Sequence, residues 1–442
     1  MRQQTTILAA AAIGVVLCGQ IAAQTAPGQA AAAVPLTLKD AETLALKNHP
    51  RVLEAQSMAS EAGQQVREAK SAYYPALDAD LTGTQGNKDA RIGAGYLTAS
   101  SLWTRFGQGV TLSQLITDSG RTPNLVASSG LHAQATQENY QATRYDVLLR
   151  VNQAYFDALR AEAVVRVAEE TVKTRQVLSN QVTELARNKL RSQLDVSFAD
   201  VNLSQAKLLL IRAQDSVKQA FAELTRAIGF AQPAAYALTD PSLPPSPPVS
   251  PDRLIADAMN NRPELLSLQL ERESAQKFEQ AEKDLKYPTV NVAAVGGFIP
   301  LIDQQTAPRL VPKEYEGVGV NVNIPVFNGH LFSARREAAR YRELESGQRL
   351  RNVEQQVSRD VRVAWASAST AYQRIDVTAQ LLQQASLGLS LAQGRYNLGL
   401  SSIVELSQAQ LNLTQAQIEN LSAKYDYESQ YAALQYAIGL LR

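Results

Sequence analysis

The sequence of 442 residues has few of the residue types on which most binding and catalytic chemistry depends. It holds one Cys and three His, too few for a disulfide framework or a Cys–His zinc site. Its 43 Lys and Arg nearly balance its 42 Asp and Glu, so it lacks the excess of positive charge that nucleic-acid binding requires. It contains no GxSxG motif of the kind that carries a nucleophilic serine. We therefore expect no enzyme, no cofactor, no metal site and no nucleic-acid partner.

Long apolar runs are also scarce. Arg2 precedes an apolar stretch at residues 7–17, and small residues follow up to Ala23, a pattern typical of a secretory signal peptide. Cys18 lies at the end of the stretch, but lipoprotein processing prefers a smaller residue than Leu17 before it, and the sequence does not decide whether Cys18 is lipidated. Beyond this segment nothing approaches the roughly 20 apolar residues of a spanning helix. We expect an exported protein that is soluble or enters a membrane as β-strands.

The chain contains an internal repeat. Residues 48–50 (Asn-His-Pro) recur as residues 261–263 (Asn-Arg-Pro), 213 positions later. Residues 203–206 (Leu-Ser-Gln-Ala) recur as residues 413–416 (Leu-Thr-Gln-Ala), 210 positions later. Between residues 190 and 229, 14 of the 40 positions are identical to those 210 later. This period is much longer than a solenoid repeat, and it predicts two homologous halves.

The repeat defines the expected domain organisation. A signal peptide at residues 1–23 precedes a first half at 24–240 and a second half at 252–442. The linker between them, residues 241–251, holds six prolines and cannot continue a helix. In each half we expect short helices, then two strands, then long helices. The strands are expected at about 76–116 and 288–327, and the long helices at about 120–229 and 330–440.

The predicted strands are amphipathic. Residues 318–326 alternate apolar with polar or small side chains, as in a strand with two different faces. One interpretation is a sheet packed on helices; the other is a membrane sheet, whose tilted strands need about 9–11 residues. Four strands per chain cannot close in lipid, so the second interpretation requires an oligomer, and a trimer supplies twelve strands. The side chains then expected to face lipid are Val318, Val320, Val322, Ile324 and Val326, with Gly319, Asn321 and Asn323 facing the lumen.

The helical stretches are unusually long. Residues 122–187 contain no proline after Pro123, and residues 331–396 contain none. Helices of this length span about 100 Å and must pack lengthwise against other helices. The expected helix-turn tips are Asn188, Leu190, Gly399, Leu400 and Ser402. Gly399 suits a helix C-terminus, and Ser402 with Glu405 suits a capping box.

Four segments carry a resemblance to a known family. They are Leu-Thr-Leu-Lys-Asp-Ala at residues 36–41, Tyr-Pro at 74–75, Ile-Pro-Val-Phe-Asn-Gly at 324–329, and Arg-Tyr-Asn-Leu-Gly-Leu-Ser-Ser-Ile-Val-Glu-Leu at 395–406. With the duplicated layout, the chain from Leu36 to Leu441 resembles the TolC family of outer-membrane efflux proteins. The resemblance implies a mainly α protein with a membrane β-barrel. Its homotrimer would form a 12-stranded β-barrel continuous with a periplasmic α-helical barrel.

The resemblance also implies the function. Such a protein is the outer-membrane channel of a tripartite efflux or type I secretion system, with a large periplasmic portion. It is a passive, tip-gated exit duct for substrates delivered by a periplasmic adaptor and an inner-membrane RND, ABC or MFS-type transporter. A periplasmic adaptor is the alternative, although an adaptor should have one helical hairpin in a β-rich chain. The sequence does not identify the substrate or the type of pump.

The family's tunnel is closed at its periplasmic tip by polar and ionic links. The matching positions here are Asp195, Tyr396 and Glu405. The sequence departs from the family in Ser401, where some members have Arg, and in Lys189, where glycine is expected. Three basic residues crowd the same turn: Arg187, Lys189 and Arg191. Our hypothesis is that this turn forms ion pairs with Glu405 that keep the aperture closed; solvated turn charges are the alternative.

Overall fold

A computed structural model describes residues 34–87, 103–231, 236–305 and 311–441. The expected signal peptide, with Cys18, lies outside these residues. The first half comprises β1 (Val34–Leu36), α1 (Leu38–Asn48), α2 (Pro50–Ser71), β2 (Ala76–Thr84), β3 (Arg105–Thr117), α3 (Arg121–Arg187), α4 (Gln193–Ile228) and β4 (Tyr236–Leu238). The second half comprises α5 (Asp252–Asn261), α6 (Pro263–Asp284), β5 (Thr289–Ile302), β6 (Glu314–Asn323), α7 (Leu331–Asn397) and α8 (Ile403–Ala437).

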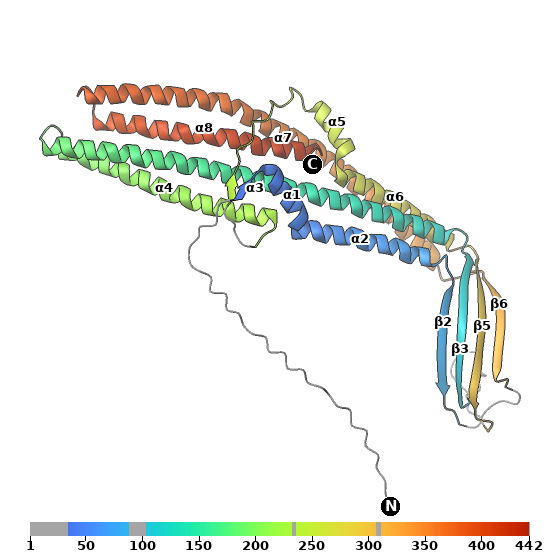
Figure 1. The fold of residues 1–442 in the computed structure, drawn as a ribbon. Helices are drawn as coiled ribbons and strands as arrows, with labels where there is room; N and C mark the ends of the chain where they lie inside the picture. Colours follow the sequence, from blue (N-terminus) through green and yellow to red (C-terminus); the bar gives the residue numbers. More distant parts are fainter. Residues whose placement is uncertain (1–33, 88–102, 232–235, 306–310, 442) are drawn as a thin grey trace, which may run out of the picture.

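The two long helices α3 and α7 set the length of the molecule. Each has 67 residues, which at about 1.5 Å per residue is about 100 Å. Towards the helix-turn tips, α4 returns along α3 and α8 returns along α7, giving the order α4-α3-α8-α7. Towards the sheet the order is α2-α3-α6-α7. The sheet and the tips therefore lie at opposite ends of an elongated molecule (Figure 1).

The larger sheet is antiparallel with the strand order β2-β3-β5-β6. Paired residues share a face, so the register places Leu77, Leu112, Ala294 and Val318 in one apolar row. Asn291 and Asn321 pair on the opposite face. The expected strand at residues 318–326 was too long: β6 ends at Asn323, because Pro325 has no N–H to donate to the ladder. Ile324 and Val326 therefore lie beyond the strand.

A second, two-stranded sheet and the linker cross the middle of the helices. β1 pairs with β4 in parallel. The buried Tyr155 hydroxyl of α3 lies 2.9 Å from the Leu36 carbonyl and 2.7 Å from the Thr239 carbonyl, and it accepts from the Thr239 N–H at 3.0 Å. The linker is held by two side chains of the second half. Tyr427 donates to the Pro245 carbonyl, and Trp365 Nε1 donates to the Pro248 carbonyl at 2.8 Å. The linker is thus tied to the long helices rather than free.

The duplication seen in the sequence extends to a specific contact. Gly229 (φ +93°) packs against the backbone of His49, where a Cβ would lie 2.8 Å from the His49 Cα. Gly439 (φ +74°) packs in the same way against Asn261 and Arg262. In both halves, the glycine that ends the returning helix allows this close approach. His49 itself caps α2, accepting from the Arg51 N–H at 3.2 Å.

Across the four described ranges, no helix is both long enough and apolar enough to cross a membrane.

Candidate functional site

The two hairpin turns have the same backbone geometry. Lys189 N–H donates to the Ala186 carbonyl and Leu190 N–H to the Leu185 carbonyl, both at 2.9 Å. In the second half the Gly399 and Leu400 N–H groups donate to Tyr396 and Arg395 at 3.0 and 2.8 Å. This Schellman pattern places Lys189 at φ +61° and Gly399 at φ +73°, both left-handed. The first half thus uses a lysine in a conformation that favours glycine.

The helices that leave these turns are capped differently. Ser192 and Asp195 form a complete capping box, in which Ser192 Oγ accepts from the Asp195 N–H at 3.1 Å and Asp195 accepts from the Ser192 N–H at 3.0 Å. Ser402 accepts from the Glu405 N–H at 3.4 Å. The Glu405 carboxylate, however, forms an ion pair with Arg395 at 3.2 Å. The capping box expected in the second half is therefore only half formed.

The basic residues of the first turn do not reach Glu405 within this chain. Arg187 pairs with Glu184 at 2.6 Å on its own helix. Arg191 does cross to the second half, where its Nη2 donates to the Tyr396 carbonyl at 2.9 Å. Its guanidinium carbon also lies 4.2 Å from the centre of the Tyr396 ring. The expected ion pairs to Glu405 are replaced by this cation–π and hydrogen-bond contact with Tyr396.

Tyr396 lies at the centre of the packing between the hairpins. It is 2% exposed and belongs to an apolar cluster with Leu178, Val182, Ile403 and Leu406. Its hydroxyl has no hydrogen-bond partner among the described residues. Burial raises the pKa of Tyr396, so the hydroxyl stays neutral. Tyr396 therefore contacts Arg191 through its ring and its carbonyl, and not through its hydroxyl.

The tips carry exposed apolar side chains. Leu190, Leu398 and Leu400 are all more than 60% exposed. The neighbouring turn residues have no apolar side chain that could cover these leucines. They are Asn188, Lys189, Gly399 and Ser401. These leucines are large apolar side chains that the single chain leaves exposed.

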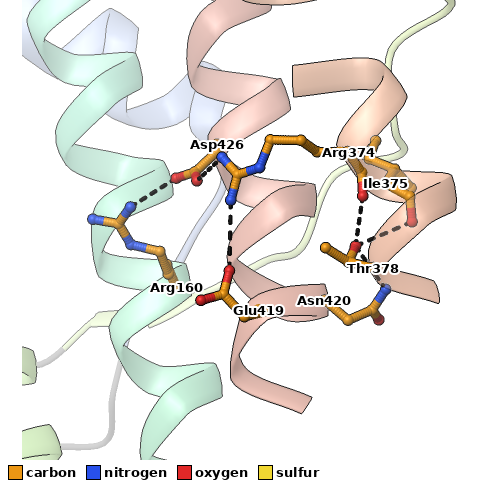
Figure 2. Close-up of polar contacts among 7 residues, drawn as sticks. All are labelled: Arg160, Arg374, Ile375, Thr378, Glu419, Asn420 and Asp426. Atoms are coloured by element: carbon orange, nitrogen blue, oxygen red, sulfur yellow. Dashed lines mark hydrogen bonds and ion pairs between the residues drawn. The ribbon is translucent and has the colours of Figure 1, made fainter. Parts of the chain in front are cut away.

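A charged network that the sequence did not reveal joins three helices near mid-length (Figure 2). Asp426 of α8 accepts from Arg160 of α3 at 2.8 Å and from Arg374 of α7 at 3.3 Å. Arg374 also pairs with Glu419 of α8 at 3.6 Å. Asp426 is two positions from Lys424, which binds Asp240 beside the linker at 2.7 Å. Because two positions are about 200° around a helix, the network lies on the face opposite the linker.

The sheet leaves an apolar face uncovered in the single chain. Val318, Val320 and Val322 of β6 are 80%, 67% and 53% exposed, and Leu77 and Leu81 of β2 are similarly exposed. β2 and β6 are the edges of the sheet. A flat apolar face and two open edges are unstable in water and need a partner.

Two helices also have uncovered apolar faces. On α4, Leu194, Val201 and Leu208 recur every seven residues. On α7, Val363, Val377 and Leu391 recur every fourteen. Each of these side chains is more than half exposed, although the heptad spacing is that of helices that pack lengthwise. α4 and α7 are the outermost helices of the layer.

The part of the chain that the structure describes offers no metal centre. It contains no group of three or more His, Cys, Asp or Glu side chains placed to hold an ion. The features with functional chemistry are the tip contact, the charged network, and the uncovered faces of the sheet and helices.

Comparison with known proteins gives these features a context. The family model described as "Outer membrane efflux protein" matches residues 43–230 and 254–440, one segment in each half. The outer membrane efflux protein BepC of Brucella suis biovar 1 (strain 1330) is 24% identical over 98% of this chain and 90% of its own. The outer membrane protein TolC of Escherichia coli (strain K12) is 22% identical over 89% of this chain and 80% of its own.

The fold is shared with solved structures as well. The crystal structure of CusC superposes with a TM-score of 0.77, covering 91% of this chain and 92% of its own at 20% sequence identity. At this identity the similarity shows a common fold.

Proposed function

The chain belongs to the outer membrane efflux protein family, and from this premise we propose that three copies of it form a continuous exit duct. It is a passive channel of the outer membrane with a large periplasmic helical portion, and it is not an enzyme. Neither the family match nor the similar structures support the adaptor alternative.

The proposed trimer is supported by one observation: the strands of the sheet and the long helices follow the same order across the molecule, from the first half to the second. First-half elements (β2, α4) lie at one side of the molecule, and second-half elements (β6, α7) lie at the other. One side of a copy can therefore pair with the opposite side of the next copy at both ends of the molecule. Head-to-tail contacts of this kind generate a closed ring when the rotation closes. Three copies supply twelve strands, enough to close around a lumen.

This assembly assigns the two faces of the wall. Three copies of β1, β4, α1, α5 and the linker would obstruct a lumen, so we place these segments outside. The network of Arg160, Arg374, Asp426 and Glu419 then lines the duct. In the barrel, Val318, Val320 and Val322 face lipid, while Gly319, Asn321 and Asn323 face the lumen.

The tips are the proposed gate and docking surface. In a trimer the Asp195 and Glu405 positions give six carboxylates around the narrow end, which attract cations. The Arg191–Tyr396 contact holds the two hairpins of each copy together in the closed state. The exposed leucines at the tips bind a periplasmic adaptor, which connects the channel to an inner-membrane transporter of the RND, ABC or MFS type.

The proposal is tested with the full-length protein in detergent and in planar bilayers. We expect a trimer by mass photometry and cation-selective single channels of low conductance. Asp195→Ala combined with Glu405→Ala should weaken the cation preference. A stable monomer in mild detergent would contradict the assembly. Unchanged selectivity in the double variant would contradict the role of the carboxylates in ion selectivity, but not the trimeric assembly.

A further inference from the structure

Arg175 is a buried cation without an anionic partner. It lies on α3 and is 5% exposed. Its Nη1 donates to the Asn202 carbonyl of α4 at 3.0 Å, whereas its Nε has no hydrogen-bond partner. None of the ion pairs among the described residues includes Arg175. An unpaired charge in such a position is costly, because the protein has removed most of its water.

The neighbouring carboxylates are already engaged. Glu170 pairs with Lys173 at 3.7 Å. Asp200 accepts from the Ser179 hydroxyl at 2.7 Å. Burial lowers the pKa of Arg175, yet a guanidinium in a protein does not lose its proton at neutral pH. No carboxylate among the described residues forms an ion pair with Arg175, so no side-chain ion pair balances its charge.

Arg175 lines a small cavity between the two halves. The cavity measures about 70 Å³, and its other walls include Leu389 of α7, and Gln410 and Thr414 of α8. Glu170 and Thr171 of α3 also line it; the Glu170 side chain is 68% exposed and pairs with Lys173. One water needs about 10–15 Å³ by the same kind of measure, so there is room for a small ion. The cavity lies between the first hairpin (α3 and α4) and the second hairpin (α7 and α8).

The cavity holds a second unsatisfied polar group. Gln410 is 6% exposed, and its Oε1 has no partner. The hydroxyls of Thr171 and Thr414 donate to the carbonyls of Val167 and Gln410 at 2.8 and 3.0 Å, so they bring no charge. The Gln410 Oε1 has almost no accessible surface, so the NH₂ group is the part of this side chain that can face the cavity. Arg175 and Gln410 can then both donate to one central acceptor.

We propose that this cavity binds one small monovalent inorganic anion, of the chloride class, between the Arg175 guanidinium and the Gln410 side-chain amide. A bound anion balances the buried charge of the Arg175 guanidinium. Because its ligands come from α3 and α8, the anion links the two hairpins of one copy and stabilises their contact. This site is independent of the assembly and gating proposed above.

The test compares chloride with gluconate, an anion too large for the cavity. Thermal unfolding of the purified full-length protein is followed at increasing sodium chloride, with sodium gluconate keeping the ionic strength constant. We expect a saturable rise in the unfolding temperature, on the order of a few degrees, with chloride. Arg175→Met should abolish this rise, and Gln410→Leu should weaken it. The matched control is Arg166→Met, because Arg166 is an exposed arginine of the same helix and its loss should leave the chloride effect intact.

A crystal soaked in bromide gives a direct readout that does not depend on any variant folding. We expect one anomalous peak in the cavity, within hydrogen-bond distance of the Arg175 guanidinium. Equal unfolding temperatures in chloride and gluconate, or a cavity without a bromide peak, would overturn the proposal in favour of water alone. A chloride effect that persists in Arg175→Met would overturn it as well, by placing the anion elsewhere.

Discussion

Lys189 and Gly399 occupy the same left-handed position in the two hairpin turns, with φ +61° and +73°. A residue with a Cβ is strained there by about 1–2 kcal/mol, and glycine's greater freedom in the unfolded chain offsets part of that difference. We expect Lys189→Gly to stabilise the first hairpin by about 0.5–1 kcal/mol, measured by hydrogen exchange of the turn amides. The converse change, Gly399→Lys, should destabilise the second hairpin by a similar amount. Unchanged exchange in both variants would mean that neither turn is strained.

Glu428 of α8 is predicted to make stability depend on pH. It is 1% exposed, both its carboxylate oxygens lack partners, and burial raises its pKa from 4.5 to about 7. Lys424 lowers the pKa and Asp240 raises it, but burial has the larger effect. The folded state therefore holds this proton over a pH range in which the unfolded state releases it. The resulting stabilisation is complete below pH 4.5 and is lost as the pH rises to about 7.

We expect the unfolding temperature of the protein to fall between pH 5 and pH 8. Glu428→Gln keeps a neutral side chain of the same shape, so this variant should show a smaller fall and should be more stable than the natural protein at pH 8. Thermal unfolding at four or five pH values measures both. The same slope in the two proteins would show that Glu428 ionises normally in the folded state.

Of the tip residues, the sequence singled out Arg191 and Tyr396, and the structure brings these two together. It did not predict how they meet. Arg395 and Glu405 lie on either side of one tight turn, so they pair locally, and Glu405 is not left for the first half. Residue spacing identifies a turn and its charges. It does not tell which of several cations faces a given carboxylate, because that depends on how the two hairpins pack.

At the scale of the hairpins, the contact between Arg191 and Tyr396 can be separated into its parts. Arg191→Ala removes both the hydrogen bond to the carbonyl and the cation–π contact, worth about 1–2 kcal/mol together. We expect it to raise single-channel conductance. Tyr396→Phe retains the ring and the carbonyl and loses only an unpartnered hydroxyl. This variant should conduct like the natural protein, and a large increase would assign the closing contact to the hydroxyl.

Two neighbouring residues of β6 can test which face of the sheet is in contact with lipid and which faces the lumen. Val322 pairs with Val290 on the apolar face, and Asn321 pairs with Asn291 on the other. Val322→Arg should impair membrane insertion, because an arginine on the lipid face is unfavourable. Val322 lies one residue from the end of β6, so we expect a cost below the ~2–4 kcal/mol of the midplane. Asn321→Arg should insert normally and alter conductance. Fractionation and bilayer recording measure the two effects, and equal insertion would mean that the faces are misassigned.

Elements that are specified by a pattern within one short segment could be predicted from the sequence, whereas contacts between distant segments could not. α3 begins one residue before the expected start at 122 and ends at the expected Arg187, because a helix-forming stretch without proline after Pro123 defines its own limits. The end of β6 was misjudged, because alternation continues past the proline that stops the ladder. The network of Arg160, Arg374 and Asp426 was not predicted at all. Its members are 52 to 266 residues apart, and only the packing of α3, α7 and α8 brings them together.

For the molecule as a whole, the proposed trimer depends on the uncovered faces of α4 and α7. Ile211 is 61% exposed on the outermost helix α4. Ile211→Asp would bury a charge between copies, and we expect it to lower the trimer fraction in detergent by about tenfold. Val177 is equally exposed, at 63%, but lies on α3, whose flanks are already covered by α4 and α8. Val177→Asp should therefore assemble normally; equal loss in both variants would place the contact elsewhere.

The two unpaired strands at the ends of the β2-β3-β5-β6 order have a consequence for the kinetics of assembly. When two copies join head to tail, one edge of each is satisfied, but the pair still has two open edges, as many as a single copy. Only the addition of the third copy closes the ring, and this step pairs all the remaining open edges at once. A dimer therefore has half as many interfaces per copy as the closed trimer, and it leaves two strand edges unpaired. We expect it to be unstable. In the proposed trimer, copies should pass from monomer to closed ring with almost no dimer accumulating, and the rate should rise steeply with the number of chains per area of membrane.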